Sequence, residues 1–388
     1  MRSPKQFLIP DDISKRINSL QFILIVLIVI HHTFFDFYYK FLCTPEPIYV
    51  EKIRILFTDI VVKVAVPLFF IISSFFLYSK ENSFVTVLKK KSRTVLLPYI
   101  LWNFLYILWV FIVQNNPIRE LSTPPEYCLI NYSPLDWLQA FLGDFSHSQS
   151  LERFPFNYPL WFLRDLFILN LFFIPIKKII DKFPFAVLML AILLWVSGIQ
   201  LWVVAPRSLL FFMLGYYIVK YNNTVNLVDK IRFRDVGLIY VLSVFLELFF
   251  KNKFIAIDKI NVIIGIIFFA KGSLYLIKDK KFYNSLMWLG KYRFIIYTSH
   301  VIIIPYAIRI MVILIPMNGA FLLLKYFGAV ILTILLCIML GIILNKLMPR
   351  FYRILTGGRS KKQNAPALDT KIYTPALSPA QAISPKDD

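Results

Sequence analysis

The sequence has only three cysteines in 388 residues, and their spacing matches no metal-binding motif. Acidic residues are also few: 22 Asp and Glu stand against 43 Lys and Arg, which gives a formal net charge of +21. No cleavable signal peptide is evident, because the first apolar run is too long for one and lacks a small-residue cleavage site. No internal or inverted repeat is visible, which argues against a repeat-built transporter. We therefore expect no metal site, and we expect the first apolar run to be kept as a membrane span.

What the sequence has in excess is apolar surface. Hydrophobic residues make up 58% of the chain and the mean hydropathy is +0.67, whereas soluble domains contain roughly 45–50% apolar residues. Ten apolar segments are candidate spans, several of them short for a hydrocarbon core of about 30 Å. They are residues 17–38, 54–78, 94–114, 159–176, 184–200, 205–219, 236–250, 260–277, 294–314 and 320–345. The sequence predicts an all-α, polytopic membrane protein with about ten transmembrane helices.

The basic residues sort by side of the membrane. If the N-terminus is cytoplasmic, 29 of the 43 Lys and Arg fall in the termini and inner loops, and seven fall in the outer loops. This asymmetry follows the positive-inside rule and predicts that both termini are cytoplasmic. Topology thus accounts for the positive charge without a nucleic-acid partner. Residues 1–356 form the expected membrane domain, and the Pro- and Lys-rich composition of residues 357–388 predicts a disordered cytoplasmic tail.

The densest inner cluster of positive charge is Lys89, Lys90, Lys91 and Arg93. Such a cluster sets orientation and attracts anionic lipid. It could equally attract the phosphates of a nucleotide-bearing donor such as coenzyme A. The sequence leaves both readings open.

On the outer side, Cys43 and Cys128 lie in the first two outer loops. An oxidising compartment would permit a disulfide between them. Spacing alone does not show whether their Cα atoms approach, so the pairing stays open.

The first span ends, while still apolar, in two adjacent histidines. At 100° per residue, His32 shares a helix face with Asn18, Gln21 and Asp36. A single polar stripe on an apolar helix indicates a bundle interior, and a histidine there is a functional-site hypothesis. The alternative is a hydrogen bond between helices that stabilises packing. We take His32 as the candidate titratable group.

Other polar residues fall inside predicted spans. Asp59 and Lys63 are four residues apart, as an ion pair on one helix requires, and Arg164 is followed by Asp165. On the predicted topology a set of polar residues clusters in the outer half of the membrane: His32, Asp59, Lys63, Arg164, Asp165 and Arg309. A base beside cations is the minimum for acyl transfer, in which a cation stabilises the oxyanion. The same set would also serve proton-coupled transport.

Five blocks in order resemble the acyltransferase-3 family of bacterial membrane acyltransferases. They are the first span with its terminal histidine, VPLFFIISSFF, KKKSRTVLLPYILWN, PLWFLRDLFIL and YRFIIYTSH. His32 matches the family histidine, while Gln21 stands where the family has a basic residue ten positions before it. Ser73-Ser74 replaces the family's Ser-Gly, and His300 matches a late family histidine.

The resemblance implies an acyl-CoA donor, no bound cofactor, and as acceptor a hydroxyl of a surface polysaccharide or glycolipid. It also implies a multi-pass protein of the bacterial plasma (inner) membrane, in contact with lipid. We assign roles to the matching residues: catalytic His32, Arg164, Asp165 and Lys63; donor-binding Lys90, Lys91 and Arg93; substrate-binding Trp161, His300 and Arg309. His32 would be the general base, with Arg164 and Lys63 positioning or stabilising the acyl group.

Acyl-CoA is cytoplasmic, whereas the candidate cluster lies in the outer half. Either the thioester arm reaches through the bundle, or the acyl group passes through a covalent relay. A transporter or flippase for an anionic or lipid-linked substrate is the competing function, because intramembrane charges also mark transport pathways. A membrane sensor that signals through its tail is a third.

Overall fold

The computed structural model describes residues 9–38, 46–80, 83–114, 132–143, 154–199, 204–221, 224–250, 255–316 and 319–359. Within these ranges every regular element is helical, as the sequence predicted. The α-helices are α1 (Asp11–Asp36), α2 (Ile48–Ile55), α3 (Ala65–Tyr78), α4 (Phe84–Lys91), α5 (Leu97–Gln114), α6 (Pro134–Leu142), α7 (Trp161–Leu171), α8 (Phe173–Lys182), α9 (Pro184–Ser197), α10 (Pro206–Lys220), α11 (Thr224–Lys230), α12 (Phe233–Phe250), α13 (Ile255–Leu276), α14 (Lys280–Gly290), α15 (Arg293–Leu314), α16 (Leu322–Leu347) and α17 (Pro349–Leu355). The π-helices are η2 (Leu56–Ile60) and η4 (Ser92–Leu96), and the 3-10 helices are η3 (Val61–Val64), η7 (Tyr158–Leu160) and η8 (Gly319–Phe321).

The predicted count of ten spans is not confirmed. In the described part of the chain, six helical stretches are long and apolar enough to cross a membrane: Asp11–Asp36, Ile48–Tyr78, Phe84–Gln114, Ala256–Leu276, Arg293–Leu314 and Leu322–Leu347. The bent pair of Tyr158–Leu171 and α8 makes a seventh only if its two parts together form one span. The remaining predicted spans correspond to α9 and α10, which are short, and to α12, which carries three charged residues. The protein is thus a multi-pass membrane protein with fewer clear spans than its apolar segments suggested.

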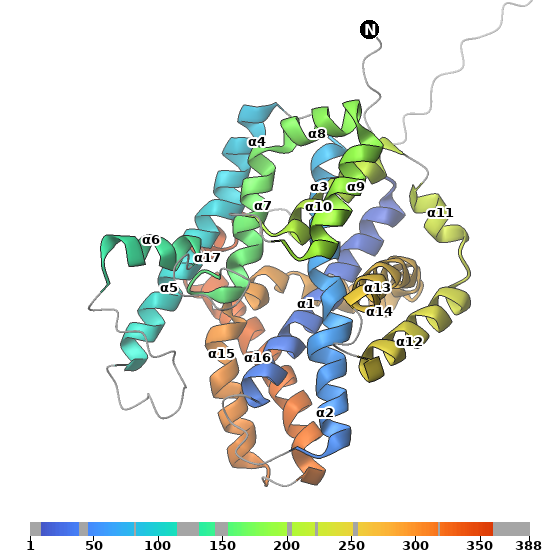
Figure 1. Cartoon of the computed structure of the whole chain (residues 1–388). Coiled ribbons are helices and arrows are strands. Elements are labelled where there is room, and N and C mark those ends of the chain that lie inside the picture. Colours follow the sequence, from blue (N-terminus) through green and yellow to red (C-terminus); the bar gives the residue numbers. More distant parts are fainter. Residues whose placement is uncertain are drawn as a thin grey trace, which may run out of the picture.

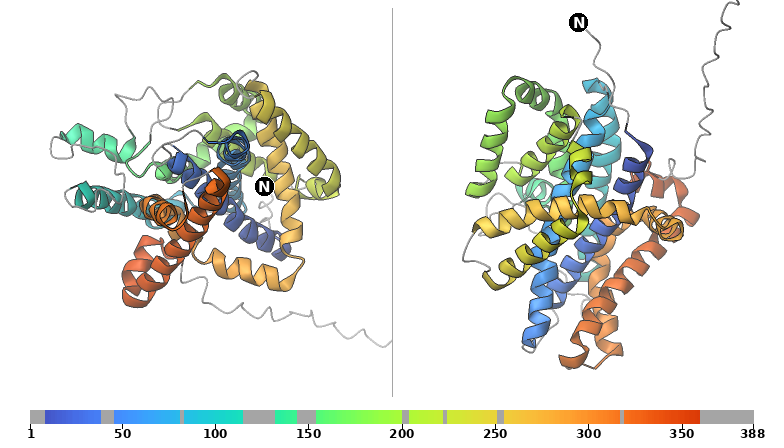
Figure 2. Two further views of the ribbon diagram at one scale, coloured as in Figure 1. Left: turned by 90° about the horizontal axis from the view of Figure 1, so that it is seen from below. Right: turned by 90° about the vertical axis from the view of Figure 1, so that its right-hand side faces the viewer.

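Helix α1 is the central element of the bundle (Figure 1). It packs against α15, α16, α13, α14 and α3, and its apolar residues belong to the largest buried cluster. Helices α15 and α16 lie side by side (Figure 1), and α13 lies across α1 (Figure 2, right). A second apolar core joins α3 to α7, α8, α9 and α10. The candidate site forms where these two packed groups meet.

The second span is not a regular α-helix. It runs from α2 through the π-helix η2 and the 3-10 helix η3 into α3, with Ile60 at φ −117° and ψ −71°. Such local changes of helical period alter the direction in which side chains point, and they frequently occur at functional sites. They also displace Asp59 and Lys63 from the regular i,i+4 spacing that was expected to pair them.

The predicted fourth span bends by 64° between α7 and α8. Pro175 lies in the first turn of α8, where its ring nitrogen has no hydrogen to donate to the carbonyl of Leu171 and its ring crowds that carbonyl. The bend follows from this proline. It ends α7 early and directs α8 across the end of α9 and α10.

Close approach of α3 and α10 depends on small residues from both helices. A Cβ added to Gly215 on α10 would lie 1.7 Å from Ser74 Oγ and 2.5 Å from the Ile71 carbonyl oxygen on α3. Small residues such as Ser73 and Ser74 allow membrane helices to approach closely. In the structure the glycine that permits this contact lies on the partner helix, at position 215.

Ordered structure continues past the predicted domain boundary at 356. Gly357, Gly358 and Arg359 form a turn after α17, in which both glycines have positive φ, 62° and 75°. The rest of the predicted tail, residues 360–388, lies outside the described residues, and so do Cys43 and Cys128.

Candidate active site

A cavity of about 780 Å³ lies between α1, the second span, α7, α10, α13 and the start of α15. Its lining is mostly apolar and aromatic, with Val66, Phe69, Trp161, Phe162 and Leu166 among the wall residues. Polar groups line it in three places: beside the two histidines of α1, beside Lys63, and at the start of α15. A largely apolar pocket with a few convergent polar groups is the usual form of a small-molecule site.

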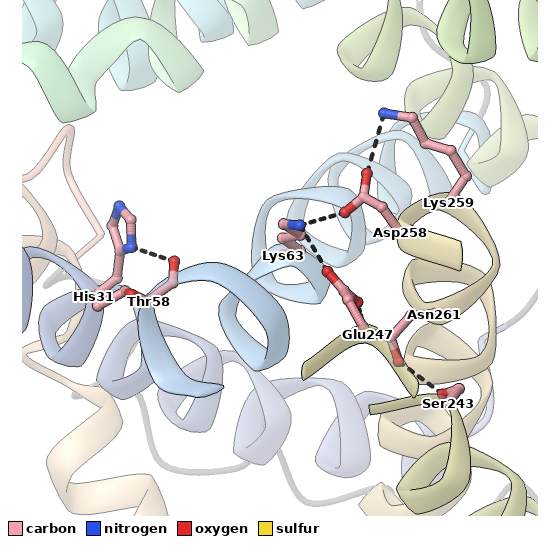
Figure 3. A network of polar contacts seen from close by, with 8 residues as sticks. All are labelled: His31, Thr58, Lys63, Ser243, Glu247, Asp258, Lys259 and Asn261. Atoms are coloured by element: carbon pink, nitrogen blue, oxygen red, sulfur yellow. Dashed lines mark hydrogen bonds and ion pairs between the residues drawn. The ribbon is translucent and has the colours of Figure 1, made fainter. Parts of the chain in front are cut away.

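The polar stripe predicted on α1 faces this cavity. Gln21, His32 and Asp36 all line it, as does His31. The Nδ1 of His31 lies 2.7 Å from the Thr58 carbonyl oxygen (Figure 3). Since a carbonyl can only accept, this nitrogen carries the proton, and the lone pair of a neutral ring is on Nε2. The π-helix η2 supplies the carbonyl that fixes this ring.

His32 lies among three other rings. Its centroid is 4.6 Å from His31, 4.9 Å from Tyr158 and 5.2 Å from His300. The buried His300 donates from Nδ1 to the Ile296 carbonyl oxygen at 3.0 Å, so its Nε2 is an acceptor. Among the described residues, His300 Nε2 and the Tyr158 hydroxyl have no hydrogen-bond partner. The structure therefore brings the predicted base and the predicted late histidine together, with a phenol beside them.

The three imidazoles do not suggest a metal centre. Within the described part of the chain, no group of three His, Cys, Asp or Glu side chains is arranged to hold a metal ion.

Lys63 lines the cavity, and its charge is balanced by carboxylates from distant helices (Figure 3). Its amine binds Glu247 Oε1 on α12 at 2.8 Å and Asp258 Oδ1 on α13. Asp258 in turn pairs with Lys259 at 3.4 Å, and Asn261 donates to Glu247 at 2.7 Å. The network ties the irregular second span to the α12–α13 pair. A lysine whose ammonium group is paired with two carboxylates is poorly placed to stabilise an oxyanion.

Arg164 and Asp165 bind each other and do not line the cavity. The Asp165 carboxylate is fully buried and also accepts from the Ala205 N–H at 3.1 Å and from the Ser208 hydroxyl at 2.8 Å. Arg164 Nη1 donates to the Leu142 carbonyl oxygen at 2.6 Å. This pair therefore holds the beginning of α10 against α7, as a capping side chain would.

Arg207 lies between Ala205 and Ser208, inside the predicted span 205–219, and was not among the predicted site residues. Its side chain lines the cavity, with the guanidinium 4.4 Å from the centre of the Trp161 ring. Its guanidinium lies close enough to His31 for the two side chains to interact electrostatically. Trp161, a predicted substrate residue, lines the cavity as well. Arg207 is thus the cation that the structure places beside the histidines, in the position for which the sequence suggested Arg164.

Arg293 and Arg359 line the cavity at the start of α15. The predicted donor site lies nearby on α4 and η4: Lys90 and Arg93 are exposed there, while Lys91 is partly buried and interacts electrostatically with Arg359. Lys90, Lys91 and Arg93 do not line the cavity, and neither does Arg309 further along α15.

A match to the acyltransferase domain family covers residues 14–342, most of the chain. The protein belongs to this acyltransferase-3 family. The chain is also similar to the succinoglycan biosynthesis protein ExoH of Rhizobium meliloti (strain 1021), with 28% identity over 228 residues. That alignment covers 56% of this chain and 57% of the relative, so the chain spans just over half the length of the curated protein it matches. No solved structure matches the chain.

Among the cavity residues that sequence reasoning missed are Tyr158, Arg207, Arg293 and Arg359. Tyr158, Arg207 and Arg293 lie at the beginning of an apolar segment, where charged and aromatic side chains are ordinary interfacial residues, and Arg359 lies well after the last segment. Nothing in the local pattern distinguishes them from such residues. Only the packing of distant helices turns them toward one cavity.

Proposed function

We propose that the protein is a membrane acyltransferase that moves an acyl group from acyl-CoA to a hydroxyl of a surface polysaccharide or glycolipid. The observation that carries this proposal is that one cavity is lined both by the imidazoles of His31 and His32 and by Arg293 and Arg359. Family membership supports the acyl transfer, and the relative's role in succinoglycan biosynthesis supports a polysaccharide acceptor. The positive-inside charge distribution supports a plasma-membrane orientation with both termini cytoplasmic.

In the proposed reaction, the acceptor hydroxyl oxygen attacks the thioester carbonyl carbon while His32 takes up the hydroxyl proton. Arg207 stabilises the negative oxygen of the tetrahedral intermediate. The carbon–sulfur bond then breaks, and the leaving thiolate takes the proton from the His32 imidazolium. The products are the acyl ester and free CoA thiol.

The depth of the cavity favours direct transfer over a covalent relay. Gln21 and His32 both line it, and eleven residues of helix separate them by roughly 16 Å along the axis. A thioester arm entering beside Gln21 can therefore reach His32 without an acyl-enzyme intermediate.

The test is a turnover assay on the detergent-purified protein with radiolabelled acetyl-CoA and succinoglycan oligosaccharide as the acceptor probe. We expect His32→Ala to lower turnover by about 10²–10⁴-fold, the usual contribution of a general base, at unchanged protein yield. Lys346→Ala, an exposed change near the end of α16, is the control and should keep wild-type turnover. Retained activity in His32→Ala would refute the assigned base. Stable acetyl-CoA binding without turnover by the wild type would favour transport instead.

A further inference from the structure

Two arginines from different parts of the chain meet at one end of the cavity. Arg293 is the first residue of α15, and Arg359 lies in the turn that follows α17. Arg293 Nη1 donates to the Gly290 carbonyl oxygen at 3.3 Å, and Arg359 Nη1 donates to the Thr356 carbonyl oxygen at 2.9 Å. Neither arginine has a carboxylate partner among the described residues. Since each guanidinium has five N–H donors, most of this donor capacity stays available to a ligand.

The two charges repel each other. Burial and the neighbouring Arg293 lower the pKa of Arg359 to about 10, so it stays protonated at neutral pH. Lys91 adds a third positive charge close to Arg359. Like charges brought together in a partly desolvated site cost free energy that a bound anion would recover.

The position of Arg359 is fixed by the local fold. Its guanidinium lies 4.0 Å from the centre of the Phe294 ring, a contact that a planar guanidinium favours. The turn that carries it needs glycine, because Gly357 has φ 62° and a Cβ there would lie 2.8 Å from Thr94 Cα and from the Thr94 carbonyl oxygen. The turn thus packs tightly against η4 and places the guanidinium of Arg359 at the cavity.

The distance from this pair to the histidines suits one class of ligand. Seven residues of α15 separate Arg293 from His300, which is roughly 10 Å of helix, and His300 lies beside His32. The pantetheine arm of coenzyme A links its thioester to a diphosphate over the length of about four extended residues, roughly 14 Å. A diphosphate at the arginines would therefore leave the thioester within reach of His32.

We propose that Arg293 and Arg359 form an anion site that binds the diphosphate of the acyl-CoA donor. Two guanidinium groups can each form paired hydrogen bonds with phosphate oxygens. This inference rests on the proposed function, since it names the residues that would hold the nucleotide end of its donor. It also gives the turn after α17, beyond the family domain, a role in the site.

The test compares two thioesters that differ only in the phosphate-bearing part. Arg293→Gln and Arg359→Gln should each raise the KM for acetyl-CoA by about 10- to 100-fold, the loss expected for hydrogen bonds to a charged group. The KM for S-acetylpantetheine, which has no phosphate, should not change. Arg350→Gln removes the same charge from an exposed position on α17 and should leave both values at wild type. Arg359→Lys should restore part of the acetyl-CoA affinity.

Calorimetric binding of CoA in an uncharged detergent gives a readout without turnover. We expect both Gln variants to bind CoA more weakly than the wild type, by the same factor of about 10- to 100-fold that is expected for the KM of acetyl-CoA. An unchanged KM and CoA affinity, or an equal loss with both thioesters, would overturn the anion site while leaving the acyltransferase proposal standing. CoA binding that needs both arginines, without any turnover, would overturn the acyltransferase proposal alone. If the two Gln variants lose phosphatidylglycerol binding but keep CoA binding, the site binds lipid phosphate and the donor assignment is wrong.

Discussion

Asp165→Asn tests whether the Arg164–Asp165 pair positions Arg207. The substitution keeps the size of the side chain but removes the charge that holds Arg164 at 2.9 Å and accepts hydrogen bonds from Ala205 and Ser208. Removing one partner of a buried ion pair costs about 3–5 kcal/mol, because the other charge stays buried. Weakening the hold on the start of α10 adds about 1 kcal/mol.

The stability arm is thermal unfolding of the purified protein in detergent. At about 2 °C per kcal/mol for a chain of this size, we expect the unfolding midpoint to fall by roughly 8–12 °C. The matched control is Asp181→Asn, because Asp181 forms an ion pair with Lys220 at 3.1 Å but its side chain is 44% exposed. Such a pair is worth at most about 1 kcal/mol. Equal midpoints for the two variants would contradict the assigned burial.

The activity arm separates positioning from stability. Asp165→Asn should lower kcat at a temperature where the variant is fully folded, because Arg207 is displaced from the oxyanion. Combining it with Arg207→Gln should add little further loss, since both changes remove the same interaction. If the two losses multiply, Asp165 does not act through Arg207.

Two further predictions follow from the packing and from the charge at the anion site. Gly215→Ala should lower the unfolding free energy by about 1–3 kcal/mol, because the added methyl group overpacks the α3–α10 contact. The control is Gly237→Ala, where the nearest atom would be 3.6 Å from the added Cβ and stability should be unchanged or rise. A similar loss of stability in both variants would refute the close approach of α3 and α10. CoA affinity should fall as the pH rises toward and through the pKa of Arg359, about 10, because loss of positive charge from Arg359 and from the neighbouring Lys91 weakens the attraction for phosphate. Calorimetry from pH 8 upward would show this fall in the wild type, and an equal fall in Arg359→Gln would contradict its assignment to Arg359.

Hydropathy and helical period predicted the local features of this protein correctly. The all-α class, the first three spans and the last three follow from runs of apolar residues long enough to cross a bilayer. The face shared by Gln21, His32 and Asp36 lines the cavity because residues on one helix keep their relative directions whatever surrounds them. The predicted count of ten is not confirmed where apolar runs are short or broken, as at α9, α10 and the Pro175 bend, since a window of apolar residues does not reveal where a helix turns.

A membrane-embedded helical bundle with a polar stripe on its first span can be predicted from the sequence, because these properties depend on composition and on neighbours three or four residues apart. Which charges meet depends on how distant helices pack. Lys63 is held by Glu247 and Asp258, Asp165 by the start of α10, and Arg293 lies with Arg359 at one end of the cavity. These pairs depend on long-range helix packing and on irregular turns at η2 and Gly357, and no local pattern encodes which of many boundary charges a distant helix will approach.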